Sequence, residues 1–489
     1  MTINDIYNTR PKFYKILPST GVNRVNKIQI YQSDFLSELY PSGHKINDPL
    51  YYENIFKKIN RKDSNGVEYE QVVEMAIERV SLAMQQVILT KHLTHLCGKD
   101  IRFVYSGSNY TQKKKKLVKD LKQGWIKKNM ETAKYDFCKS VKATGDGAFC
   151  AFMEKGVFSY RVFSALNGDG LHPIFGFNGK LELFGRSFTA FDYEAQEEVL
   201  YLEVWDNINF TRYKYSTANR NADQDGWQIQ SPPRPHGFSE IPIVYKKVEK
   251  GACWSDVQDL IDKLEMALSQ LFENNKSYAF RIMVIKGGFE IQGDLRGQAR
   301  AIMMEDTDGS AGFMEKADAS SSFSLQLEQT LKFILMGSFT VLPPEVKGGD
   351  LPGVTIKILY SPSVEQGIND KNEYNSAIDQ MVKLFKHGYG IEQGSVSEYD
   401  SLDVRGDIDV YVHQNDAEII SNLNTSVLDG TLSVETAAER HPDAASDEME
   451  RLERQNRQEL TGTGGVEVYK GEKSNSGDNL YNQQQAQTK

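Results

Sequence analysis

The sequence is poor in cysteine and lacks long hydrophobic runs. Its four cysteines, Cys97, Cys138, Cys150 and Cys253, lie far apart among 489 residues and lack the close spacing of zinc ligands. We therefore expect reduced thiols, as in a protein made in a cytoplasm, and no metal. No apolar stretch reaches the roughly 18 residues that a membrane-spanning helix needs, so no membrane association is expected.

An excess of positive charge is also lacking. The chain has 57 lysines and arginines against 67 acidic residues, which gives a net charge of −10. Proteins that hold nucleic acid tightly usually present a basic face to it. The overall composition therefore argues against a repressor or a polymerase clamp.

Catalytic motifs are absent as well. There is no phosphate-binding loop of the P-loop type, no H-E-x-x-H pair and no nucleophile elbow. His92 and His95, with Cys97 nearby, have a spacing that places two rings on nearly one helix face. No fourth ligand is close, which favours an ordinary helix end with favourable charge over a metal site. We predict no catalytic residue and no cofactor, and hence a protein that is not an enzyme.

The sequence does contain a long amphipathic helix. Ser255 with Gln258 three residues later is a capping-box pattern, which predicts a helix over residues 255–278. Apolar residues recur along it at helical spacing. The opposite face is acidic and carries Asp256, Asp259, Asp262, Glu265 and Glu273.

A small insert, a second helix and a loop follow. Short strands are predicted over residues 280–285 and 301–304 and from 313, with a small helix over 292–300 between them. The second long helix starts at Ser320–Ser322 and ends at Phe339, before two prolines. Residues 346–352 form a loop with two glycines, and residues 353–360 predict another helix.

The flanking regions are mixed. Residues 1–65 indicate short helices, and residues 68–96 a long helix. Strands are predicted over 148–153, 158–163, 181–191, 199–205 and 210–215, followed by a polar, proline-rich loop over 219–235. Further on, the pattern predicts helices over 369–387, 416–428, 433–440 and 447–460 and a strand over 407–412. Residues 461–489 are polar and expected to be disordered.

Residues 111–144 are the most basic segment. Their lysines are Lys113, Lys114, Lys115, Lys116, Lys119, Lys122, Lys127, Lys128, Lys134, Lys139 and Lys142. Such a run indicates either a nucleic-acid patch or the solvated face of an amphipathic helix, and the second is the more common.

Several phrases, in their order along the chain, resemble the portal proteins of tailed bacteriophages, of the type found in long-tailed phages of Gram-positive hosts. The phrases are EIPIV at 240–244, SDVQDLID at 255–262, RIMVIKG at 281–287, GVTIKILYSP at 353–362, GTLSVETA at 430–437 and DEMERLE at 447–453. They cover about residues 70–455 of the chain. No single phrase is diagnostic, but their order is.

The resemblance implies an α+β portal fold with wing, stem, clip and crown regions, long stem helices and a β-rich wing. The implied regions are an N-terminal arm (1–67), the wing (68–250), a first stem helix (251–278), the clip (279–318), a second stem helix (319–345), a tunnel loop (346–353), a tunnel helix with a return to the wing (354–412), the crown (413–460) and a disordered tail (461–489).

The resemblance also implies roles for residues. The five acids of the first stem helix would form a channel wall that repels phosphates, although they could equally be a solvated helix face. The tunnel loop would lie nearest to DNA, and Lys347 would touch phosphates unless it points to solvent. That loop contains Val346, Lys347, Gly348, Gly349, Asp350 and Leu351. In the clip, Arg281, Lys286, Arg296 and Arg300 would serve partner docking or pairing between subunits.

The implied function is a ring of twelve copies at one capsid vertex that conducts double-stranded DNA during packaging and ejection. The implied partners are the terminase large subunit, which supplies the ATPase, a head–tail adaptor, and the major capsid protein or a scaffold. The protein would be assembled in the host cytoplasm and reside in the virion. Alternatives are another ring-shaped connector of the neck or tail, or a nucleic-acid-processing enzyme that uses the basic segment.

Overall fold

The computed structural model describes residues 2–18, 25–62, 68–75, 77–107, 110–193, 196–215, 226–279, 283–286, 289–291, 302–304, 310–313, 320–342, 353–412, 416–442, 451–452 and 455. The chain divides into two compact units, Met1–Gly349 with Ile358–Val412, and Asp350–Lys357 with His413–Lys489. Helices and sheets are both present, in agreement with the predicted α+β class.

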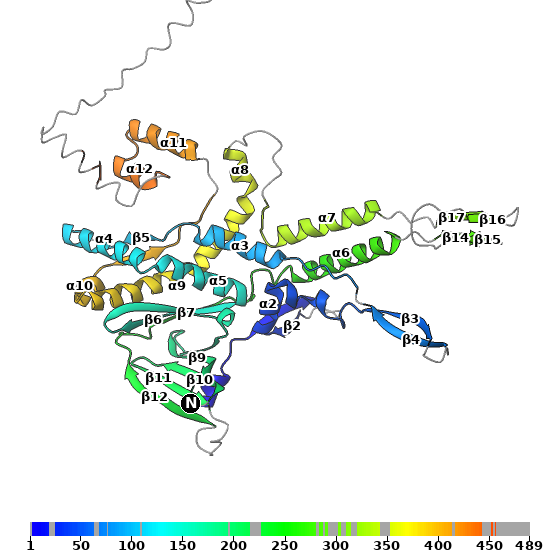
Figure 1. Cartoon of the computed structure of the whole chain (residues 1–489). Helices are drawn as coiled ribbons and strands as arrows, with labels where there is room; N and C mark the ends of the chain where they lie inside the picture. The colour runs from blue at the N-terminus through cyan, green and yellow to red at the C-terminus, as the bar shows by residue number, and fades with distance from the viewer. Residues whose placement is uncertain are drawn as a thin grey trace, which may run out of the picture. The chain divides into compact units, whose positions relative to one another are not determined.

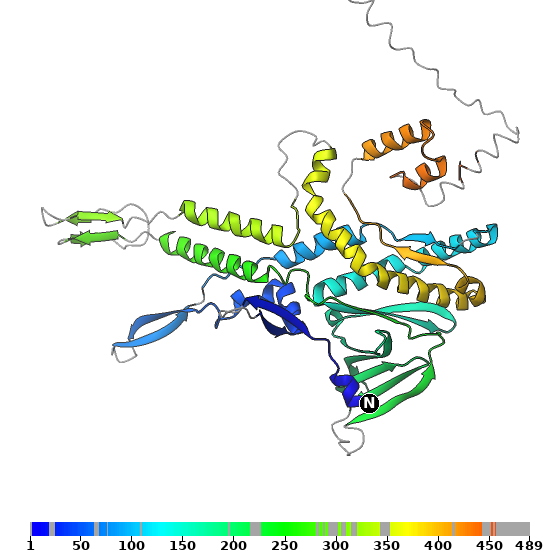
Figure 2. The ribbon, with the colours of Figure 1, turned by 180° about the vertical axis from the view of Figure 1, so that it is seen from behind.

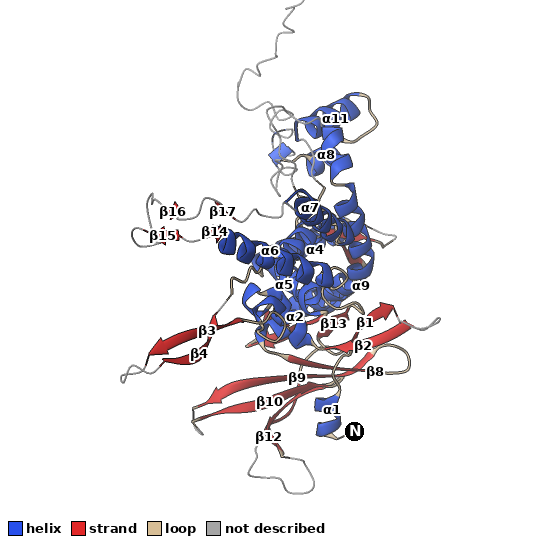
Figure 3. Cartoon of the chain, turned by 90° about the vertical axis from the view of Figure 1, so that its right-hand side faces the viewer, coloured by secondary structure: helices blue, strands red, loops and turns tan. Residues whose placement is uncertain are grey.

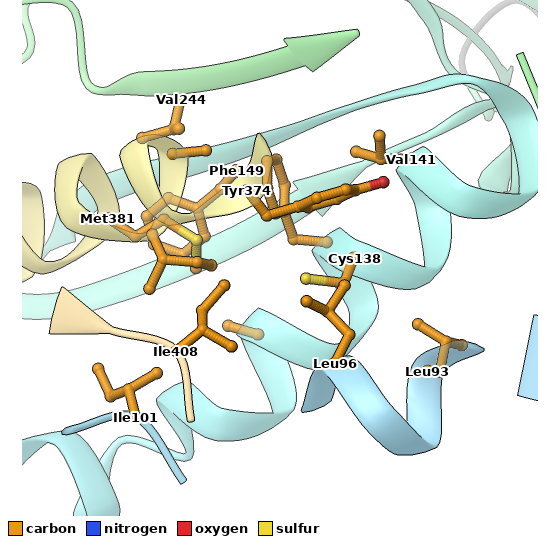
Figure 4. Close-up of a cluster of buried hydrophobic side chains, with 14 of the residues drawn as sticks. Leu93, Leu96, Ile101, Cys138, Val141, Phe149, Val244, Tyr374, Met381 and Ile408 are labelled. Carbon is orange, nitrogen blue, oxygen red and sulfur yellow. The ribbon is translucent and has the colours of Figure 1, made fainter. Parts of the chain in front are cut away.

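The main core of the first unit is helical. Helices α3 (Met84–Cys97), α5 (Met130–Thr144) and α9 (Ser361–Glu392) pack against one another, and α4 (Gln112–Lys127) contacts both α5 and α9. Their apolar faces meet in a buried cluster that includes Leu96, Cys138, Tyr374 and Met381 (Figure 4). Helix α9 also contacts α10 (Val396–Asp400) and strand β18 (Val404–Asp407), which pairs with β5 (Arg102–Tyr105).

Two antiparallel sheets lie on one side of these helices (Figure 3). The first has the strand order β13 (Ile243–Lys247), β6 (Asp146–Glu154), β7 (Val157–Phe163). The second has the order β12 (Trp227–Pro235), β11 (Asn209–Tyr215), β10 (Glu197–Trp205), β9 (Leu181–Asp192), β8 (Gly170–Phe175), and the 3₁₀ turn η3 (Ala165–Asn167) precedes β8.

Buried Arg186 of β9 links the two sheets. Its guanidinium lies 4.3 Å from the ring centre of Phe163 on β7 and 4.2 Å from that of Phe188. It also forms ion pairs of 2.7 Å with Asp169 and 2.8 Å with Glu203. Because both acids are buried with it, the arginine satisfies charges that would otherwise be costly inside the protein.

The five predicted strands between residues 148 and 215 are confirmed, with ends within a few residues. The sequence reasoning missed β8 and β13, and it was wrong about residues 227–235, which form β12 and not a loop. The prolines there were misleading. Strand β12 lies at the edge of its sheet. Proline is tolerated there, because its missing N–H can face away from the neighbouring strand.

One helix prediction was wrong at its start. Residues 68–75 form strand β4 (Glu68–Met75), and the helix begins only at Met84. Residues 68–75 form a strand because they pair with residues 55–62. The basic segment 111–144, for which an amphipathic helix was one interpretation, forms two helices, and Asn129 adopts a left-handed conformation (φ 53°) between α4 and α5.

The described N-terminal residues pack into the first unit. They comprise α1 (Ile3–Asn8), the hairpin β1 (Phe13–Pro18) and β2 (Val25–Ile30), α2 (Gln32–Leu39), and the 3₁₀ turns η1 (Pro41–Gly43) and η2 (Lys45–Asn47). Phe13 and Phe35 are buried in the main core, and Ile6 is buried against the five-stranded sheet. A second hairpin follows, made of β3 (Ile55–Lys62) and β4.

Helices α6 (Gln258–Ala279) and α7 (Ser320–Gly337) lie side by side (Figures 1 and 2). Between them the chain forms two small antiparallel pairs, β14 (Met283–Lys286) with β17 (Ser310–Phe313), and β15 (Phe289–Ile291) with β16 (Ile302–Met304). The predicted helix over 292–300 lies outside the described residues. The predicted capping box is wrong: residues 253–257 form turns, and the buried Ser255 Oγ has no described partner.

Helix α8 (Gly353–Leu359) lies at its predicted position, and the division of the chain into units falls within it, between Lys357 and Ile358. The second unit also contains α11 (Asp416–Leu428) and α12 (Val434–Arg440), both near their predicted positions. Ser433 caps α12 by accepting a hydrogen bond from the Thr436 N–H.

Candidate channel wall and subunit surface

The root of α6 is anchored in the main core. Trp254 is fully buried and Val257 is buried just before the helix, and Ile261 and Leu264 are buried along its first two turns. From α7, Ile334 is fully buried in the same cluster. The predicted apolar spacing therefore places α6 correctly against the core.

Two of the five predicted wall acids are buried, so the prediction is wrong for them. Asp262 and Glu265 keep only 5% and 1% of their surface exposed. Asp262 accepts hydrogen bonds from Lys45 Nζ at 2.9 Å and from Gln258 Nε2 at 2.7 Å. The segment around η2 covers the helix face that the periodicity assigned to solvent, and it supplies the cation.

Glu265 is held by two groups. Its Oε1 lies 2.7 Å from His44 Nδ1 and accepts a 2.7 Å hydrogen bond from the Leu82 N–H. The other ring nitrogen of His44 lies 2.8 Å from the Glu38 carbonyl oxygen, which is consistent with a doubly protonated ring. The pair is therefore a charge-assisted contact shielded from water.

This cluster shifts two pKa values. Burial opposes the charge of His44, but the hydrogen bond and the negative charge of Glu265 outweigh it, so the pKa of His44 is raised. Burial raises the pKa of Glu38 to about 7, although the indole N–H of Trp254 donates to it at 3.0 Å. Both groups lie at the root of α6, and the pKa of each is raised there.

The other three acids are not buried in this way. Asp256 pairs with Lys250 at 2.9 Å, and both side chains are more than half exposed. Asp259 is 56% exposed and pairs with Lys15 at 2.7 Å. Glu273 accepts a 3.3 Å hydrogen bond from the backbone N–H of Glu78. Three of the five predicted residues therefore remain accessible enough to face a channel.

A strip of apolar side chains on α6 and α7 is uncovered in the single chain. Phe272 is 55% exposed, Leu325 57%, Phe333 50% and Met336 62%. The sequence reasoning assigned Phe272 to a buried face and did not single out the other three. The sequence indicated this exposure only indirectly: the two helices contain more large apolar residues than one core-facing stripe can hold. We call these four residues the apolar strip.

The remaining predicted site residues fall outside the described residues. These are the tunnel-loop residues Val346, Lys347, Gly348, Gly349, Asp350 and Leu351, and the clip residues Arg281, Arg296 and Arg300. Lys286 is the last residue of β14, and its side chain is not described. Their roles stay predictions.

The basic segment is partly internal. Lys142 is buried and lies 2.6 Å from Asp370, and Lys134 is buried and donates to the Lys99 carbonyl oxygen at 2.7 Å. Lys113 pairs with Glu398 at 2.7 Å and Lys128 with Glu392 at 2.9 Å. Several of its charges are thus used within the chain, which weakens the case for a nucleic-acid patch.

The two histidines of α3 each contact a backbone carbonyl oxygen. His92 Nε2 lies 2.7 Å from the Ser338 carbonyl oxygen, and burial lowers its pKa to about 4, so it is neutral. The predicted favourable charge at the helix end therefore does not apply to His92. His95 Nδ1 lies 2.8 Å from the Tyr411 carbonyl oxygen. Within the described ranges there is no group of three or more metal-binding side chains.

The described part of the chain has no helix long and apolar enough to span a membrane. An α+β body that carries a pair of adjacent helices with an uncovered apolar strip is typical of a subunit of a larger structural assembly.

Comparison with known proteins identifies the family. The family model described as phage portal protein, SPP1 Gp6-like, matches residues 44–461, which is most of the chain. The chain belongs to this family of phage portal proteins, a family of structural proteins. A search of curated proteins found no match.

Proposed function

We propose that twelve copies of this chain form a ring at one vertex of a phage capsid and that the ring conducts double-stranded DNA during packaging and ejection. The observation that carries the proposal is the apolar strip on α6 and α7. Four large side chains at or above half exposure are costly in a monomer, and adjacent copies in a ring would cover them. In this proposal α6 and α7 are the stem helices.

The wall would act by repulsion. A channel through which a duplex slides must not bind phosphates strongly, because each contact would have to be broken at every step. Asp256 just before α6, and Asp259 and Glu273 on α6, would supply the negative charge. Asp262 and Glu265 instead serve to fix the root of the helix. The tunnel loop 346–351, with Lys347, would constrict the bore nearest the DNA.

Membership of the portal family supports our proposal for the other partners. Residues 279–318 would form the clip, which meets the terminase during packaging and the head–tail adaptor afterwards. The capsid protein or a scaffold would contact the outer parts. The packaging ATPase would be supplied by the terminase, since the chain contains no P-loop. The virion and its portal vertex would be the protein's final location, after assembly in the host cytoplasm.

Negative-stain microscopy of the purified protein tests the ring. We expect rings with a central hole from the wild type and loss of rings from a Phe333→Ser, Met336→Ser variant. The matched control is Glu328→Ser, Lys332→Ser, which changes two exposed polar residues of the same helix and should keep the rings. A wild type that stays monomeric at every concentration would exclude the proposal.

DNA handling tests the wall and the loop. We expect assembled rings that carry Asp256→Asn and Asp259→Asn to bind DNA more strongly, in a salt-sensitive way. The matched control carries Glu197→Gln and Glu198→Gln on β10, which removes the same amount of charge elsewhere and should not increase DNA binding. Deletion of residues 347–351 should reduce retention of packaged DNA. If packaging and retention are unchanged, the loop has no part in the mechanism.

A further inference from the structure

Among the described residues, no further strand pairs with the hairpin β3–β4. In the part of the chain that the structure describes, the two strands form a separate two-stranded sheet, with register Ile55↔Met75 to Lys62↔Glu68 (Figure 1). Phe56 is 64% and Val72 57% exposed. An isolated hairpin is marginally stable in water, and open edges are normally covered or protected. This hairpin is therefore expected to have a partner outside its own chain.

The two strands carry opposite charge. Strand β3 contains Lys57, Lys58, Arg61 and Lys62 and no acid, whereas β4 contains Glu68, Glu70 and Glu74 and no base. One contact between the strands is a 2.9 Å ion pair from Lys58 to Glu70, with both side chains exposed by more than half. The hairpin thus has one basic edge and one acidic edge. A hairpin whose two edges carry opposite charge can bind the hairpin of a second copy in head-to-tail order.

The root of the hairpin is fixed to α6. Ser269 Oγ accepts the Val80 N–H at 2.9 Å, Lys276 donates to Glu78 at 2.9 Å, and Glu265 accepts the Leu82 N–H at 2.7 Å. Arg79 closes the base by donating to the Tyr52 carbonyl oxygen at 2.8 Å. The hairpin therefore starts from a defined place beside the proposed stem, and each copy in a ring would present it in the same orientation.

We infer that the β3–β4 hairpin is an intersubunit contact: the basic strand β3 of one copy lies against the acidic strand β4 of the next. The inference rests on the proposed ring. Adjacent copies in a ring of twelve are related by a small rotation, which nearly preserves strand direction. Strand β3 of one copy would therefore run nearly antiparallel to β4 of its neighbour, as it does to β4 of its own chain. Opposite charges across such a contact stabilise it, and like charges destabilise it. A closed ring would leave no hairpin edge uncovered.

Charge reversal tests the inference. One variant carries Lys57→Glu, Lys58→Glu and Arg61→Glu, so that both of its strands are acidic. The other carries Glu68→Lys, Glu70→Lys and Glu74→Lys, so that both are basic. Each alone should lose rings, as seen by sizing chromatography and microscopy. When the two are mixed, rings should return, because acidic and basic hairpins then alternate. Rings that return on mixing cannot result from restored pairing within one hairpin, because each chain still has two strands of like charge.

The outcomes separate this inference from the proposed function. If the wild type forms rings and both reversed variants form them equally well, the hairpin contact is wrong and the ring stands. If rings persist but the acidic variant alone holds less DNA, the hairpin binds DNA and the contact is again wrong. If mixing restores nothing while each variant retains wild-type circular dichroism, the pairing of β3 with a neighbour's β4 is excluded. If the wild type itself forms no rings, the proposed function fails first.

Discussion

Replacing Glu265 with Gln would remove one charge from the buried pair with His44 and leave the shape of the side chain unchanged. The amide oxygen can still accept the Leu82 N–H, so that hydrogen bond is kept. Breaking a buried ion pair costs about 3–5 kcal/mol when one partner is left charged and unpaired. His44 can escape part of this cost by losing its proton, so we expect about 2–3 kcal/mol of lost stability at pH 6.

The loss should depend on pH with a defined sign. The pKa of His44 is raised in the folded protein above the value near 6.5 of an unfolded histidine. The stabilisation from its charge is therefore fully present below about pH 6.5 and is lost as the pH rises through the folded pKa. The difference in unfolding free energy between wild type and variant should be largest at pH 6 and fall to about 1 kcal/mol at pH 9.

Urea unfolding at pH 6, 7, 8 and 9, at one protein concentration, measures this difference. Glu38, whose pKa is about 7, titrates in the same range in both proteins, so only the difference between the curves is compared. Asp256→Asn is the matched control, because its ion pair is exposed and should contribute less than about 1 kcal/mol at any pH. A Glu265→Gln loss that is constant from pH 6 to 9 would refute a charged His44.

Three further changes test the core. Phe137→Ala removes a fully buried ring and should cost about 3–5 kcal/mol in urea unfolding. Lys142→Met leaves Asp370 as a buried, uncompensated charge and should cost about 3–5 kcal/mol, and adding Asp370→Asn should recover part of this; no recovery would mean that the lysine acts by packing. Ser255→Ala should change stability by less than about 0.5 kcal/mol, since the hydroxyl has no described partner; a loss of about 1 kcal/mol would instead indicate a capping role.

Local patterns predicted much of the fold. Alternating residues and turn signals located β6, β7, β9, β10 and β11, and helical periodicity located α7, α9 and α11. These elements are determined by short-range patterns that the sequence displays directly. The failures came where a neighbour distant in sequence decided the outcome. Residues 68–75 form a strand because residues 55–62 pair with them, and no pattern within 68–96 shows that.

The candidate site was predictable only in part for the same reason. The acids of α6 share a helix face, but the face is covered by residues more than 200 positions earlier, which contribute His44 and Lys45. Spacing along one helix carries no information on such a partner. The apolar strip could have been suspected from an excess of large apolar side chains. Its exposure, however, depends on which other parts of the chain pack against α6 and α7, and the sequence of the two helices does not show this. The family itself was recognisable, because the order of short phrases is preserved over most of the chain.

Helix α3 joins the two long helices mechanically. Near its start Gln85 donates to Gln258 at the beginning of α6, at 3.1 Å, and further along His92 contacts the Ser338 carbonyl oxygen just after α7. A load placed on either long helix is therefore carried into the same buried helix at two points, 7 residues apart and on the same side, about two turns along its axis. In the proposed ring, tension from moving DNA would therefore be shared between α6 and α7 before it reached the rest of the subunit.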